Sequence, residues 1–208
     1  MTADSMGGAS GCDSIPEAST APEPKGMLTP PYHPPFVHAG VTYDLAHLNP
    51  FHMSVESLRA GRELRVHVVF TNHCFSEGFD AAIHGATSPL IPRQQPLRVF
   101  NQTRYDLSKQ LPLLIREVNH PRAQVQQTSA GRNWVHSVRI DTPAGPYHVF
   151  FVLRRERREE NRRLQDLNMT VESAYPQGDQ RAPQVRGRIG FVLLAGKTFR
   201  GEPVATKR

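Results

Sequence analysis

The chain has few cysteines and no long apolar run, and each absence excludes a class of protein. Cys12 and Cys74 are its only cysteines in 208 residues, too few for the disulfide framework of a small secreted domain. No apolar run approaches the ~18 residues needed to cross a bilayer, and the first residues lack the basic and apolar regions of a secretory signal. We therefore expect a cytoplasmic protein with no membrane partner.

Common catalytic motifs are missing as well. The sequence has no Walker loop, no GxGxxG after a strand, no HExxH and no GxSxG, which excludes the nucleotide hydrolases and proteases that depend on them. Cys74 could act as a nucleophile with His136 or His148 as its base, but no feature of the sequence lowers its pKa. Zinc binding by His67, His73 and Cys74 is a further alternative, but these residues lack the C-x-x-C spacing that is typical of structural zinc sites. We expect no cofactor and no metal.

Composition divides the chain into a tail and one folded domain. Residues 1–35 are rich in Gly, Ser, Ala and Pro, a composition that buries too little apolar surface to offset the entropy lost on ordering. We predict a disordered tail there and a single α+β domain over 36–208. Within it, 75–103 is expected to be a long loop and 104–194 the core helix and sheet.

Apolar periodicity predicts one main helix packed on a mostly antiparallel sheet. The residues with helical spacing are Leu107, Leu111, Leu114, Ile115 and Val118. They predict a helix over about 107–119, with Pro112 in or near its first turn. Runs rich in β-branched and aromatic residues predict strands at 41–48, 63–74, 123–128, 133–140, 147–153 and 167–175, and a final apolar run at 188–196 adds another. The first two are expected to form an N-terminal strand pair.

Positive charge is concentrated in the second half. Residues 1–100 carry 6 Lys or Arg against 9 Asp or Glu (net −3), whereas 101–208 carry 19 against 10 (net +9). A one-sided basic distribution favours RNA or another polyanion as the partner. A protein partner is the alternative.

The densest charge lies between Arg154 and Arg163, where ten residues include six arginines and three glutamates. This block is either the solvent-exposed tip of a hairpin or a phosphate-binding site. All six cations are arginine, whose planar guanidinium binds phosphate through two hydrogen bonds, and this favours the phosphate-binding interpretation. Few turn residues interrupt the block, so we expect a β-ribbon extending past the core. The predicted nucleic-acid-binding residues are Arg154, Arg155, Arg157, Arg158, Arg181, Arg186 and Arg188.

Polar side chains on the later strands suggest a catalytic face. Strand alternation places Arg139 and His148 opposite the apolar positions of their strands. RNA cleavage needs no metal if a base takes the 2′-hydroxyl proton and an arginine stabilises the charge that develops on phosphorus. The alternative is that these residues face solvent or form cross-strand pairs, as Arg139 and Glu172 could.

One short motif and the order of elements carry a family resemblance. The helical RYDLSKQLPLLIREV is followed by the strands NWVHSVRI, YHVFFVL and LNMTVESAYP, the last ending in a hydroxyl residue and an aromatic before proline. Over about 104–194 this layout resembles the barnase, colicin and RelE-like (BECR) ribonuclease toxins. The resemblance implies a metal-independent endoribonuclease of bacterial toxin or mobile-element type; the alternative is a non-enzymatic nucleic-acid- or protein-binding accessory module. The candidate catalytic residues are Lys109, Arg139, His148, Ser173 and Tyr175.

Overall fold

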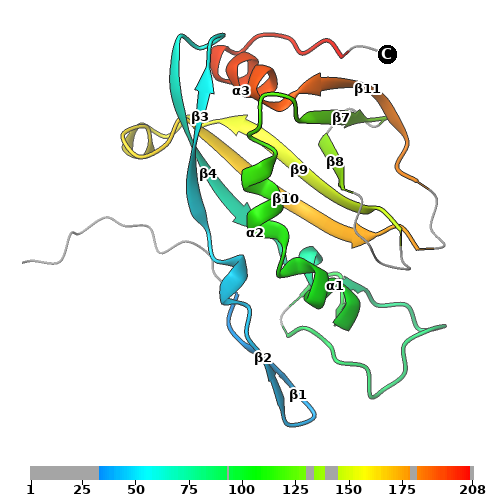
Figure 1. Ribbon diagram of the computed structural model, residues 1–208. Coiled ribbons are helices and arrows are strands. Elements are labelled where there is room, and N and C mark those ends of the chain that lie inside the picture. Colours follow the sequence, from blue (N-terminus) through cyan, green and yellow to red (C-terminus); the bar gives the residue numbers. More distant parts are fainter. Residues whose placement is uncertain (1–32, 93, 130–133, 139–144, 179–181, 207–208) are drawn as a thin grey trace, which may run out of the picture.

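The computed structural model describes residues 33–206, apart from 93, 130–133, 139–144 and 179–181. Its backbone is an α+β arrangement built on a large mixed sheet (Figure 1). Most of the predicted tail, Arg139 and Arg181 lie outside the described residues. Within the described ranges, no helix has the length and apolar composition needed to cross a membrane.

Seven strands of the described chain form the main sheet. They are β3 (Phe51–Ser57), β4 (Arg62–Phe70), β7 (Gln124–Thr128), β8 (Trp134–Val138), β9 (Tyr147–Arg155), β10 (Leu167–Pro176) and β11 (Val185–Gly190). Their order is β11-β7-β8-β9-β10-β4-β3. Neighbours are antiparallel except β10 and β4, which are parallel. The predicted α+β class is confirmed.

Three α-helices are described where one main helix was predicted: α1 (Gln102–Ser108), α2 (Leu111–Glu117) and α3 (Phe191–Arg200). The predicted helix over 107–119 is divided because Pro112 has no N–H and its ring would clash with the carbonyl of Ser108, four residues earlier. Ser108 is accordingly the last residue of α1. Pro112 then falls in the first turn of α2, where the missing N–H costs little.

The final apolar run, 188–196, was predicted as a strand and is in fact divided between a strand and a helix. β11 ends at Gly190 and α3 follows directly, with Phe191, Leu194 and Ala195 buried at helical spacing. A short apolar run fits a buried helix as well as a strand, so the sequence pattern did not distinguish them. Gly196 lets α3 pack closely on β3, because a Cβ there would collide with Ser57 Oγ.

The predicted pairing of 41–48 with 63–74 is wrong. β4 pairs with β3, a strand that the sequence analysis missed because its outward positions, His52, Ser54 and Glu56, are polar and only Met53 and Val55 supply buried apolar side chains. The predicted strand at 41–48 contains β2 (Val41–Tyr43), which pairs with β1 (Phe36–His38), and the 3-10 helix η1 (Ala46–Leu48).

The segment predicted as a long loop, 75–103, contains a second small strand pair. β5 (Ser76–Gly78) is antiparallel to β6 (Arg98–Phe100), and the 3-10 helix η2 (Asn72–Cys74) lies just before it. These short elements place Arg98 next to the end of the main sheet.

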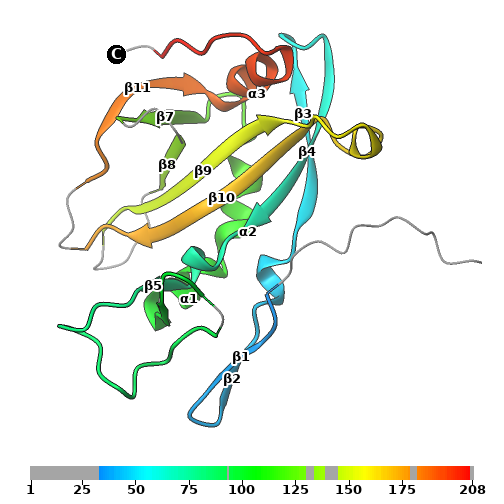
Figure 2. The same ribbon diagram turned by 180° about the vertical axis from the view of Figure 1, so that it is seen from behind.

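The helices cover one face of the main sheet (Figure 1). Phe151 on that face packs edge-on against Phe191 of α3, with 6.1 Å between ring centroids. The same face contributes further buried residues: Val66, Val68, Val149, Met169 and Val171. Figure 2 shows β9 and β10 from the opposite side, where no described helix lies over them. Alternation places His148, Phe150, Val152 and Arg154 of β9 on this uncovered face.

Candidate functional site

Five arginines gather around one cavity of about 1200 Å³ at the end of β9. Arg154 and Arg155 close the strand, and Arg157, Arg158 and Arg162 come from the loop that follows it. The pairing of β9 with β10 continues to Arg155, the last residue of β9, which stands opposite Leu167. Successive strand residues point to opposite faces, so Arg154 and Arg155 approach the cavity from different sides of the sheet. We call this space the arginine cavity.

The two carboxylates that line the arginine cavity are already engaged. Glu202 accepts hydrogen bonds from Arg59 Nε and Arg200 Nε, both at 2.8 Å. Glu156 accepts from two backbone N–H groups and three side-chain amides. Of the arginine side chains that line the cavity, the one within ion-pair distance of Glu156 is that of Arg158, whose Nε lies 3.8 Å from Glu156 Oε1. Among the described residues, no carboxylate lies within ion-pair distance of Arg154, so the cavity retains excess positive charge.

Glu156 organises the loop that carries three of these arginines. It is 4 % exposed, and its Oε1 accepts from the N–H groups of Arg157 and Arg158, both at 2.8 Å. Its Oε2 accepts from the side-chain amides of Gln165 at 2.9 Å and Asn168 at 2.8 Å. Burial alone would raise the pKa of Glu156, but these hydrogen bonds outweigh it and lower the pKa to about 2.

A second buried acid fixes the far end of the same loop. Asp166 accepts hydrogen bonds from Arg62 Nη2 at 2.7 Å and from the backbone N–H of Arg65 at 2.8 Å. Although burial opposes its charge, these donors hold its pKa below the usual value. The side chain of Arg65 also donates to the carbonyls of Arg162 and Arg163. The expected β-ribbon is therefore wrong: β9 ends at Arg155, and residues 156–166 fold into a compact loop with the 3-10 helix η3 (Glu159–Asn161).

The sequence analysis missed other residues that line the cavity. Asn168 stands opposite both Arg154 of β9 and His67 of β4, so these three share one row across the uncovered face. His67 also stacks on His52 of β3, with 4.7 Å between ring centroids, and burial is the main cause that lowers its pKa. Arg162 belongs to the charged block and could have been included on that ground. Placing His67 and Asn168 at the cavity required the register of the strands, which the sequence does not give.

The other predicted nucleic-acid-binding arginines lie elsewhere. Arg186 and Arg188 are exposed on β11, the edge strand farthest from β3, and neither lines the arginine cavity. Cross-strand pairing runs from Arg188 through Gln126 and Val135 to Phe150. Paired residues share a face, so Arg188 projects from the same uncovered face as Arg154.

Three of the predicted catalytic residues are brought together by an irregularity in β10. A shift in register between Val171 and Ser173 places Ser173 opposite Phe150 and Tyr175 opposite His148. The Tyr175 ring stacks on Phe150 at 5.3 Å and meets His148 edge-on at 6.2 Å. Such a bulge reverses which residues face the core, and Ala174 is buried in place of Ser173.

Lys109 does not join that group, and Arg139 lies outside the described residues. Lys109 contacts Asp106 at 3.1 Å and the ring of Tyr105 at 4.4 Å. Arg104, which was not predicted, is the arginine whose guanidinium lies over the Tyr175 ring, at 5.3 Å. His148 is 3 % exposed, and its Nε2 lies 3.2 Å from Gln177 Oε1. A base this deeply buried is poorly placed to reach a ribose hydroxyl.

Cys74 is placed as a core residue. It lies fully buried in η2, its thiol donates to the carbonyl of Val171 at 3.8 Å, and burial raises its pKa to about 12. A thiol with this pKa contains almost no thiolate at neutral pH, which argues against the nucleophile alternative. In the described part of the chain, no three His, Cys, Asp or Glu side chains are grouped so that they could hold a metal ion.

We predict that Cys74 is unreactive in the native protein. In a Cys12→Ser variant, iodoacetamide at pH 7.5 should modify Cys74 only when urea unfolds the chain, because the thiol is both inaccessible and protonated. Peptide mass spectrometry of native and unfolded samples measures the extent of modification. Rapid modification of the native protein would contradict this placement.

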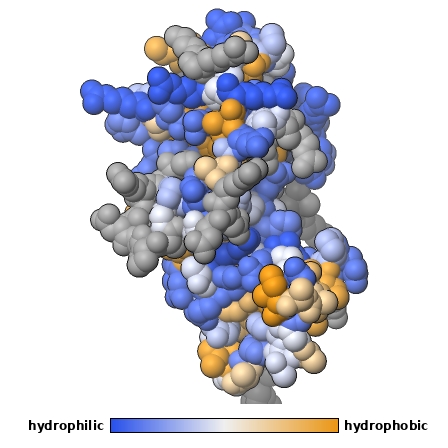
Figure 3. All heavy atoms as spheres, turned by 90° about the vertical axis from the view of Figure 1, so that its right-hand side faces the viewer, coloured by the Kyte–Doolittle hydropathy of each residue, from blue (hydrophilic) through white to orange (hydrophobic). Residues whose placement is uncertain are grey.

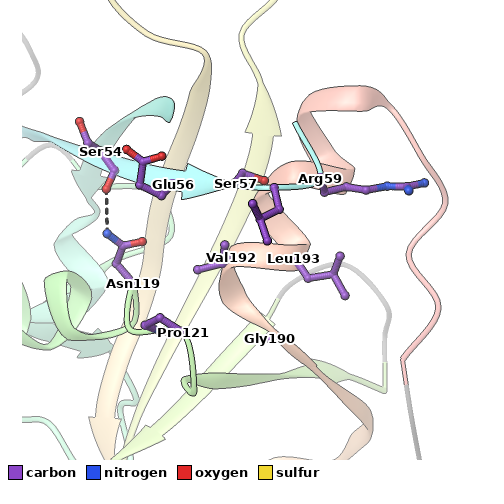
Figure 4. A pocket seen from close by; sticks show the side chains of 10 residues that line it. Ser54, Glu56, Ser57, Arg59, Asn119, Pro121, Gly190, Val192 and Leu193 are labelled. Carbon is purple, nitrogen blue, oxygen red and sulfur yellow. Dashed lines mark hydrogen bonds between the residues drawn. The ribbon is translucent and has the colours of Figure 1, made fainter. Parts of the chain in front are cut away.

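A second, more apolar cavity of about 640 Å³ lies between β3 and α3 (Figure 4). Val192, Leu193 and Pro121 supply apolar side chains, and Asn119 Nδ2 donates to the carbonyl of Ser54 at 2.7 Å. Leu58 and Leu193 are exposed at its border. Farther away, Val37 and Val41 are exposed on the β1–β2 hairpin. Figure 3 shows apolar side chains on the surface in the lower part of its view.

The mixed sheet with helices over one face defines an α+β protein. The model of the YjaZ family matches residues 35–199. The chain therefore belongs to the YjaZ family. No curated protein and no solved structure matches it.

The resemblance to the barnase, colicin and RelE-like ribonuclease toxins is therefore wrong. The family match includes 35–103, which the resemblance left out. β10, which contains the SAYP motif, pairs in parallel with β4 from that N-terminal part. The order of a helix and three strands was too common a layout to identify a family, and the motif alone did not specify one.

Proposed function

We propose that this chain binds the sugar–phosphate backbone of a nucleic acid at the arginine cavity. The supporting observation is the convergence of five arginines on a space of about 1200 Å³ whose two lining carboxylates are already hydrogen-bonded. Guanidinium groups bind phosphate oxygens through paired hydrogen bonds, and several around one groove can follow a phosphate chain. The net charge of +9 over 101–208 adds long-range attraction for a polyanion.

RNA is the nucleic acid that we favour. The arginines share the cavity with the polar side chains of Asn168, Thr170 and Thr198. Amide and hydroxyl groups can exchange hydrogen bonds with a ribose 2′-hydroxyl, which both donates and accepts and which DNA lacks. Phosphate contacts would supply affinity, and these neutral groups would supply the preference for ribose.

Fluorescence anisotropy with a labelled single-stranded RNA tests this proposal. Measurements in EDTA from about 50 to about 200 mM salt should show affinity falling steeply, since each phosphate contact releases a counterion. The same sequence as DNA should bind more weakly. RNA binding that ignores salt, or no RNA binding at all, would refute the proposal and direct attention to a protein partner at the apolar cavity beside β3.

RNA cleavage without metal is a second candidate function. It is favoured by the placement of Ser173 and Tyr175 on one sheet face, with Arg104 over the Tyr175 ring. Incubation of labelled RNA with the protein in EDTA, with a Tyr175→Phe variant as the control, tests it. Intact RNA in both samples would leave binding as the function, whereas cleavage that the variant fails to perform would establish catalysis.

A further inference from the structure

Two arginines at the other end of β10 share a single acceptor. Arg98 Nη2 and Arg104 Nη1 donate to the carbonyl oxygen of Ser76, at 2.8 and 2.9 Å. Arg98 Nε also donates to Ser76 Oγ at 2.8 Å, and Arg104 Nη1 lies 3.3 Å from the carbonyl oxygen of His73. Because both arginines donate to the same carbonyl oxygen, their guanidinium groups lie side by side.

No carboxylate in the described part of the chain forms an ion pair with either arginine. The acid that acts on both through space is Glu77, whose Oε1 lies 3.3 Å from His84 Nε2. Arg98 is 9 % exposed; burial first, and then the charge of Arg104, lowers its pKa. Buried charges are normally paired, so two adjacent guanidinium groups without an ion pair to a described acid form an unusual arrangement.

Two further hydrogen-bond donors at this end of the sheet are buried and have no partner among the described residues: Asn72 Nδ2 and the hydroxyl of Tyr147. Asn72 is linked to the arginine pair through its carbonyl, which accepts from Ser76 Oγ at 2.6 Å. Tyr147 is 0 % exposed and lies within the electrostatic influence of Arg104. Buried donors rarely remain unpaired in folded proteins.

We propose that Arg98 and Arg104 bind a small oxyanion between η2 and α1, with Asn72 and Tyr147 as additional donors. Every group in this set offers N–H or O–H, and the ionised oxygens of a phosphate or carboxylate group accept such hydrogen bonds. An oxyanion would also compensate the two charges that the described chain leaves unpaired. Arg104 lies over Tyr175 and Arg154 stands opposite Asn168, so about seven residues of β10, roughly 20 Å, separate these two groups of arginines.

Thermal unfolding with inorganic phosphate as the probe tests the site, with sodium chloride at equal ionic strength as the reference. Phosphate at about ten times its Kd should raise the Tm of the wild-type protein by about 3–5 °C beyond the chloride reference. Acetate in place of phosphate shows whether a carboxylate group is accepted as well. The Arg104→Gln variant should lose most of the phosphate-dependent rise.

The Tyr147→Phe variant keeps the test valid if Arg104→Gln fails to fold. Its hydroxyl has no partner among the described residues, so the fold should be retained while phosphate affinity falls by about 3- to 10-fold. A variant with Arg154, Arg155, Arg157 and Arg158 changed to Gln should keep the full rise, which separates this site from the arginine cavity. No rise in the wild type beyond chloride, or equal rises in the wild type and the two site variants, would overturn the proposal.

Discussion

Replacing Arg154, Arg155, Arg157 and Arg158 by glutamine should weaken RNA binding by about 100- to 1000-fold at about 0.1 M salt. All four side chains line the arginine cavity, and each phosphate that is no longer bound by an arginine keeps its counterion. The slope of log affinity against log salt should therefore become shallower by about 0.7–0.9 for each such phosphate. Anisotropy titrations of the variant and the wild type over the same salt range measure both effects.

A control variant with an equal loss of charge separates the cavity from net charge. Replacing Lys109, Arg116, Arg122 and Lys197 by glutamine removes the same four charges, and none of these side chains lines the cavity. This control should lose less than about 10-fold in affinity, because it reduces only the long-range attraction. The cavity variant should lose about 1 kcal/mol of stability or less, since all four of its arginines are exposed. Equal losses of affinity in the two variants would show that the cavity has no special role.

Replacing Glu156 by alanine should lower the free energy of unfolding by about 3 kcal/mol, because the side-chain amides of Asn161, Gln165 and Asn168 lose their acceptor. The N–H groups of Arg157 and Arg158 lose theirs as well. The loop should then present its arginines less rigidly, and RNA affinity should fall although no positive charge has been removed. Urea unfolding and anisotropy measure the two effects.

The neighbouring acids in the same block provide a matched control for Glu156. Glu159 and Glu160 are exposed, so Glu159→Gln should change stability by about 0.5 kcal/mol or less. Because the pKa of Glu156 is depressed to about 2, its contribution is fully present above the unfolded-state pKa near ~4.3. It should be lost as pH falls from there toward about 2, and a Glu156→Gln variant should lack this part of the acid dependence. Equal effects of the Glu156 and Glu159 substitutions would contradict the role of Glu156.

The sequence predicted strands well where apolar residues alternate regularly. β9 and β10 were expected at 147–153 and 167–175 and are observed at Tyr147–Arg155 and Leu167–Pro176. It failed where tertiary packing decides between conformations, because the run that begins α3 is apolar enough to be a strand. It also failed at β3, whose pairing with β4 depends on long-range interactions that the polar residues of β3 do not reveal.

For the candidate site, the composition predicted where positive charge is concentrated but not which side chains surround it. Arg154, Arg155, Arg157 and Arg158 were selected from the density of arginine, and the structure places all four around one cavity. Composition does not distinguish the three glutamates of the block, but Glu156 is buried and hydrogen-bonded while Glu159 and Glu160 are exposed. The placement of Ser173 opposite Phe150 and of Tyr175 opposite His148 depends on a bulge, and the grouping of Arg98 with Arg104 depends on two short strands. Neither leaves a periodic signal in the sequence.

The salt dependence of RNA binding by the wild-type protein tests the central claim most directly. If the five arginines of the cavity contact the backbone of a single strand, log affinity should fall with log salt with a slope of about −3 to −4. This value follows from about 0.7 counterions released for each phosphate that is bound. A slope near zero over the same range, or no measurable binding at about 50 mM salt, would contradict the assignment of the arginine cavity to nucleic acid.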